Sequence, residues 1–154
     1  MTTIILTIIG ILLAAAAALM VIFYGGDAFN SGSIGAQANT LQNAGTNIES
    51  AATLYKVENA QRPANIAALT AVGADGEAYL KEAPALTGIG TSGDLSVVGT
   101  KQLFTVTDVA DEVCAKVNDN VLGDETTEPT EVGATKMGCV RGTDGADGTF
   151  FASL

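Results

Sequence analysis

Histidine and tryptophan are both absent from this 154-residue chain. Without histidine, Ser-His and Cys-His nucleophile systems are excluded, and so is histidine-based acid–base catalysis. The sequence also has no Walker-type phosphate loop and no dinucleotide-binding fingerprint, because its glycines cluster in expected turns and not between a strand and a helix. These absences leave no recognisable catalytic residues. We therefore expect a protein that is not an enzyme and that needs no cofactor.

Basic residues are also scarce, with 7 Lys and Arg against 17 Asp and Glu and a net charge of −10. A nucleic-acid-binding protein needs a basic face that neutralises phosphates. The cations of this chain are instead spread singly along the sequence. We therefore expect no direct nucleic acid binding, and electrostatic docking to anionic lipid is equally unsupported. An acidic surface fits an extracytoplasmic protein.

Charge of either sign is missing from residues 1–26, and the first charged residue is Asp27. The apolar run 2–24 is long enough to span a bilayer, which takes about 20 residues. A cleaved signal peptide begins with basic residues, and a plain transmembrane anchor has flanking cations. Here no basic residue precedes the run, and the first cation is Lys56. We favour a third interpretation, in which a basic leader has been removed and Met1 is the processed amino terminus.

Two glycines follow this apolar run. Gly25 and Gly26 each weaken a helix by about 1 kcal/mol relative to alanine, which predicts a break near this point. We accordingly divide the chain into a membrane helix over 1–26 and a head over 27–154. Phe23 lies where an aromatic belt at the membrane interface is expected.

The head begins with a second helical pattern over about residues 28–59. Its apolar residues recur at seven-residue spacing and predict an amphipathic helix with one buried side: Ile34, Leu41, Ile48 and Tyr55. The simplest partner for that side is a small sheet formed downstream. Pro63 ends the helix, because the residue before a proline disfavours helical geometry.

The remaining chain predicts short elements. We expect a helix at 66–69, strands near 95–98 and at 101–107, a helix within 108–122, and strands at 137–141 and 149–154. Asp108 is the candidate amino-terminal cap of the third helix, and Gly123 is its expected end. Together these elements predict an α+β fold with a long helix packed on a small antiparallel sheet.

Cysteine occurs twice, at Cys114 and Cys139. An even count in a chain expected to be exported predicts a disulfide, worth roughly 3 kcal/mol by loop-entropy arguments. The alternative is two buried free thiols.

Two cysteines without histidine make a poor metal ligand set. Two acidic segments raise the possibility of a calcium site, one with Asp119, Asp124, Glu125 and Glu128, and the other with Asp144 and Asp147. Neither segment has the EF-hand spacing. We therefore favour solvated acidic loops and Asp-Gly turns, and we predict no metal site.

At this point the sequence resembles the type IV pilins, and the type IVb group in particular. The resemblance rests on the uncharged apolar start, the long helix in two halves, the stretch 36–84, and a carboxy-terminal segment in which TDVADEVCAKVND is followed by GCVRGTDGADGTFFASL. It implies a structural subunit of a type IV pilus, with a small head and a disulfide near the carboxyl end.

The resemblance also implies how such a subunit works. The subunit would be held in the inner membrane, processed by a prepilin peptidase and methylated at Met1. Assembly machinery would then draw it into a helical homopolymer, an extracellular fimbrium that can serve cell adhesion. The disulfide-closed loop 114–139 would face outward. The filament core would form from apolar side chains of the first helix: Ile4, Ile5, Ile8, Ile11, Leu12, Leu19, Ile22 and Phe23.

One position departs from the family pattern. Pilins usually carry a glutamate at the fifth mature position, where this chain has Ile5. Two other functions therefore stay open. One is a type II secretion pseudopilin or minor pilin, although pseudopilins often use calcium where this chain has two cysteines. The other is a membrane-anchored extracytoplasmic binding module, which would not need a charge-free helix able to pack against copies of itself.

Overall fold

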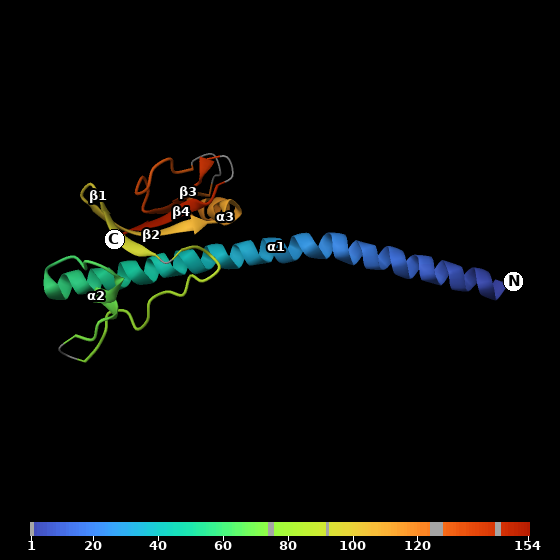
Figure 1. Cartoon of the computed structure of the whole chain (residues 1–154), viewed down its shortest axis with the longest axis horizontal. Coiled ribbons are helices and arrows are strands. Elements are labelled where there is room, and N and C mark those ends of the chain that lie inside the picture. The colour runs from blue at the N-terminus through green and yellow to red at the C-terminus, as the bar shows by residue number, and fades with distance from the viewer. Residues whose placement is uncertain (1, 74–75, 92, 124–127, 144–145) are drawn as a thin grey trace. The chain divides into compact units, whose positions relative to one another are not determined.

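The computed structural model of this chain describes residues 2–73, 76–91, 93–123, 128–143 and 146–154, and only the backbone of residues 2, 3, 23, 24 and 27. The chain separates into two compact units, Met1–Ile34 and Gly35–Leu154. Figure 1 shows the helices and strands named below.

The first unit consists of helix. Helix α1 (Thr2–Asn59) begins there and runs without interruption through Gly25 and Gly26. The predicted break at these glycines is therefore wrong for the isolated chain. Two glycines cost only about 2 kcal/mol in helix propensity, whereas interrupting a helix leaves up to four N–H and four C=O groups without partners at the new ends. The continuous helix is the cheaper arrangement.

The second unit begins with the amphipathic half of α1. The predicted stripe is buried at Leu41 and Ile48 and half-buried at Tyr55, and Ile34, the last residue of the first unit, is also half-buried. The helix ends at Asn59, and Ala60 takes a left-handed conformation with φ 53°. Pro63 follows, so the end of this helix is where the sequence predicts it.

Four antiparallel strands form the sheet, in the order β1-β2-β4-β3. Their bounds are β1 (Asp94–Val98), β2 (Lys101–Val109), β3 (Met137–Val140) and β4 (Gly148–Ser153). Helix α2 (Ile66–Thr70) precedes the sheet, and helix α3 (Asp111–Leu122) connects β2 to β3. All the predicted elements of the head are present.

The helix packs closely on one face of the sheet at Gly45. A Cβ atom on this residue would lie 3.0 Å from both Ala152 Cβ and Met137 Cε, and 3.2 Å from Phe150 Cζ. The rings of Phe104 and Phe150 meet edge to face, with centroids 6.4 Å apart. Glycine at position 45 therefore allows the helix backbone to approach the aromatic core.

The opposite face of the sheet is covered by the loop after α3. Gly133 lies against the Leu103 side chain, and buried Pro129 lies beside Gly138 and near Phe151. Consecutive buried residues Phe150 and Phe151 point to opposite faces of β4, so both faces are covered. The described part of this loop is thus part of the core packing.

The start of α3 differs from the prediction. Ala110, and not Asp108, is the residue before the first helical turn, and it makes no side-chain capping bond. Asp108 still belongs to β2, where the register shifts between Val106 and Val109, and it has φ 57°. Its carboxylate accepts hydrogen bonds from the hydroxyls of Thr91 and Thr107 and so stabilises this bulge. Gly123 ends α3 in a left-handed conformation, as expected.

Candidate functional site: an apolar helix and a disulfide-linked head

The first unit presents an apolar surface with nothing packed on it. Within the part of the chain that the structure describes, one helical segment, Ile4–Ile22, is long and apolar enough to cross a membrane, and none of it is buried. The predicted core-packing residues from Ile4 to Ile22 are 53–69% exposed. The side chain of Phe23 and all of Met1 lie outside the described residues. Such a surface needs an apolar environment, either lipid or other protein.

In the second unit, α3 and β3 are joined by the predicted disulfide. Cys114 on α3 and Cys139 on β3 are bonded, with their Cα atoms 5.2 Å apart, and both are fully buried. The alternative of two free thiols is therefore wrong. Gly148 of β4 lies directly against this bridge, because a Cβ atom there would meet Cys114 Sγ at 2.5 Å. The disulfide thus needs a glycine on the neighbouring strand.

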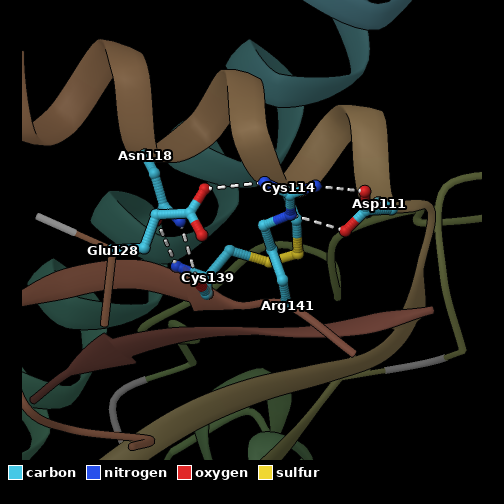
Figure 2. Close-up of a disulfide and its surroundings, with 6 residues drawn as sticks. All are labelled: Asp111, Cys114, Asn118, Glu128, Cys139 and Arg141. Carbon is cyan, nitrogen blue, oxygen red and sulfur yellow. Dashed lines mark hydrogen bonds and ion pairs between the residues drawn. A yellow bond between two sulfur atoms is a disulfide. The ribbon is translucent and has the colours of Figure 1, made fainter. Parts of the chain in front are cut away.

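A buried asparagine reinforces the same junction. Asn118, one turn after Cys114, donates from Nδ2 to the Cys139 carbonyl at 2.8 Å and accepts from the Cys139 N–H at 2.8 Å. Figure 2 shows this side chain and the disulfide converging on the same residue from α3. Since β3 is an edge strand, the asparagine amide takes the place of a neighbouring strand at Cys139.

An ion-pair cluster lies beside the disulfide at the surface (Figure 2). Arg141 donates from Nε and Nη2 to the two carboxylate oxygens of Asp111, at 2.6 and 2.5 Å. Its Nη1 donates to Glu128 Oε1 at 2.9 Å. The hydrogen bonds that Asp111 accepts from Arg141 hold the pKa of Asp111 below its usual value. The pKa of Arg141 is raised by its hydrogen bonds to Asp111 and, to a smaller extent, by the one to Glu128. The cluster links α3, the loop and the residue after β3.

The chain is similar in structure to a solved pilus subunit. The structure of the major type IV pilin PilA1 from Clostridium difficile superposes with a TM-score of 0.50 over 80% of this chain and 97% of that one, at 16% sequence identity. This chain has the type IV pilin fold. At that identity the similarity establishes the fold and nothing finer. No protein-family model matches the sequence, and no curated protein matches it.

The type IV pilin fold gives the features described above a common context. The long apolar amino-terminal helix, the small antiparallel sheet and the disulfide near the carboxyl end all agree with it. The apolar helix is also consistent with membrane anchoring.

The acidic segments have other roles where they are described. Asp119 forms an ion pair with Lys116, and Glu128 forms one with Arg141. Among the described residues no group of three or more metal-binding side chains comes together. Asp124, Glu125 and Asp144 lie outside the described residues.

Sequence reasoning missed two interactions beside the disulfide, those of Asn118 with the Cys139 backbone and of Arg141 with the carboxylates of Asp111 and Glu128. A polar residue four positions after Cys114 lies on the same side of a helix, so the spacing was a usable signal for Asn118. Arg141 lies two residues after Cys139, a spacing that puts two side chains on the same side wherever the chain stays extended, although β3 itself ends at Val140. Neither spacing by itself identifies the partner, because the register between α3 and β3 is a tertiary feature.

Proposed function

We propose that this chain is the structural subunit of a type IV pilus filament. The observation that carries the proposal is the fully exposed apolar segment Ile4–Ile22 on a protein with the type IV pilin fold. Before assembly, lipid of the inner membrane would cover this segment. After assembly, the same segments of neighbouring copies would cover it, so that it never meets water.

The proposed assembly is a helical homopolymer in an extracellular fimbrium. An open filament requires heterologous contacts, in which different surfaces of identical subunits meet. The apolar residues from Ile4 to Phe23 would form its core, with Gly25 and Gly26 as points where the helix can bend under packing. A prepilin peptidase would release Met1, which would then be methylated, and pilus assembly machinery would extract the subunit from the membrane.

Electron microscopy of filaments sheared from the native cells, with mass spectrometry of their subunit, tests this proposal. We expect thin filaments made mainly of this chain, beginning at a methylated Met1. The chain mass should be lower by about two hydrogens than that of the reduced form, because Cys114 and Cys139 are bonded. If the chain is found intact in the membrane and in no filament, it acts as a pseudopilin or as an anchored binding module instead.

A further inference from the structure

The last turns of α1 form one side of an acidic groove of about 650 Å³. We call it the acidic groove. The described residues that line it include Tyr55, Glu58, Glu77 and Tyr79, and none of them is Lys or Arg. The two tyrosine rings meet edge to face with centroids 5.2 Å apart. The Tyr79 hydroxyl donates to Glu58 Oε2 at 2.6 Å, and this bond raises the pKa of Tyr79. Carboxylates beside tyrosine rings suit a cationic side chain.

A second, smaller hollow of about 90 Å³ lies on another side of the same helix end. We call it the basic hollow, because the described residues that line it include Lys56 and Arg62, together with Leu154, and none of them is Asp or Glu. Among the described residues, Lys116, Lys136 and Arg141 form ion pairs with carboxylates, whereas these two cations form none. Arg62 donates to the Thr100 carbonyl, which fixes the guanidinium without neutralising it.

The two surfaces face different directions. Lys56 and Glu58 are two residues apart on α1, and each helical residue turns about 100°, so their side chains point about 160° apart around the axis. A single copy is therefore poorly arranged to satisfy its own charges here. Two copies related by a translation and a rotation can do so, and such a contact is heterologous, as an open filament requires.

We propose that the basic hollow of one copy docks onto the acidic groove of a second copy, with Lys56 against Glu58 and Glu77. The inference rests on the proposed filament function and specifies a contact between heads. Exposed Leu54 and Val72, which line the acidic groove, supply apolar surface that the contact would cover. Charge complementarity would thereby fix how one head is placed against the next.

Zero-length carbodiimide cross-linking of filaments that contain two isotopic forms of the chain tests the contact. Filaments are assembled from a mixture of unlabelled and ¹⁵N-labelled full-length chains, cross-linked, digested and analysed by mass spectrometry. We expect mixed-isotope peptides that join Lys56 to Glu58 or Glu77. Filaments that yield same-isotope links alone, or no links at Lys56, overturn the docking and leave the filament function standing. If no filaments form, the proposed function fails, and this contact fails with it.

Charge-reversal variants give a second readout. Lys56→Glu alone and Glu77→Lys alone should each lower the yield of pelleted filaments about fivefold, and the double variant should recover most of that loss. Lys81→Glu and Glu82→Lys change the same charges at exposed positions outside both surfaces and serve as matched controls. Equal yields for the Lys56 and Lys81 variants would overturn the proposal.

Discussion

At the scale of single residues, Asn118 shows how one side chain can seal a sheet edge. Its amide meets both backbone groups of Cys139 on the edge strand β3, and it is fully buried. An uncovered strand edge offers free N–H and C=O groups to other chains. In a protein proposed to exist at high local density in a filament, this arrangement protects the head from pairing through β3.

Replacing this side chain tests its contribution. Asn118→Ala leaves the buried Cys139 N–H and C=O without partners, so we expect a loss of about 2 kcal/mol in the free energy of unfolding. Urea unfolding of the full chain in detergent measures this loss. Asn120→Ala removes an exposed amide from the same helix and should change stability by less than about 0.5 kcal/mol. Equal effects of the two substitutions would contradict the role given to Asn118.

The Arg141 cluster predicts a dependence of stability on pH. The folded-state pKa of Asp111 lies below its ordinary value of 3.8, chiefly because of the hydrogen bonds from Arg141. The stabilisation is therefore fully present above about pH 4 and is lost as the pH falls through the folded pKa. Because Arg141 is 39% and Asp111 26% exposed, solvent screening keeps the effect below about 1 kcal/mol.

Asp111→Asn should accordingly lower stability by more at pH 6 than at pH 2, as measured by thermal unfolding at the two pH values. Glu112→Gln removes the next carboxylate, which is exposed in the same helical turn, and controls for the loss of charge. A pH dependence that is identical in the Asp111 variant and the native chain would show that the cluster contributes nothing.

At the scale of elements, the sequence predicts those parts that depend on local pattern. The stripe Leu41 to Ile48, the proline after α1 and the glycine after α3 each act within their own segment, and the structure has each where it is expected. The prediction of Asp108 as a helix cap is wrong because the residue matches the local signal for a cap, but its carboxylate instead accepts hydrogen bonds that stabilise the bulge between β2 and β4. The prediction of a break at Gly25 gave too much weight to the low helix propensity of glycine. That free-energy cost is small compared with the cost of the unpaired backbone groups at two new helix ends.

The contact between α1 and the sheet depends on a glycine that local pattern does not distinguish from others. In Gly45→Ala the added methyl would lie 3.0 Å from two carbon atoms of β3 and β4, so we expect a loss of about 1–2 kcal/mol despite better helix propensity. Gly35→Ala has nothing within 4 Å of the new methyl and should gain up to about 1 kcal/mol. Chemical denaturation of both variants measures the difference, and a gain in both would mean that the helix is not closely packed at Gly45.

At the scale of the whole molecule, the two units would divide the work of the proposed filament subunit. Among the described residues, every buried hydrophobic side chain lies at Ala38 or later, and the exposed apolar run lies at Ile4–Ile22. The folding of the head and the demand for an apolar environment therefore belong to different parts of the sequence. In the proposed function, this separation would allow one chain to pass from lipid to filament without refolding its head.

A fragment of residues 27–154 tests this separation directly, because it keeps all the described core residues and loses the apolar run. We expect it to be monomeric in buffer without detergent, to retain the Cys114–Cys139 bridge, and to unfold in a single cooperative transition. Light scattering measures association and circular dichroism measures unfolding. The full chain in buffer should aggregate under the same conditions because its exposed helix remains.

The other outcomes would contradict this separation. A fragment that associates as strongly as the full chain would place the main self-association surface in the head, whereas an unfolded fragment would show that the apolar helix is needed for folding. Monomeric, cooperatively folded fragments would instead leave the helix as the part that commits the subunit to lipid or filament, with the weaker contacts between heads setting how neighbouring copies are placed.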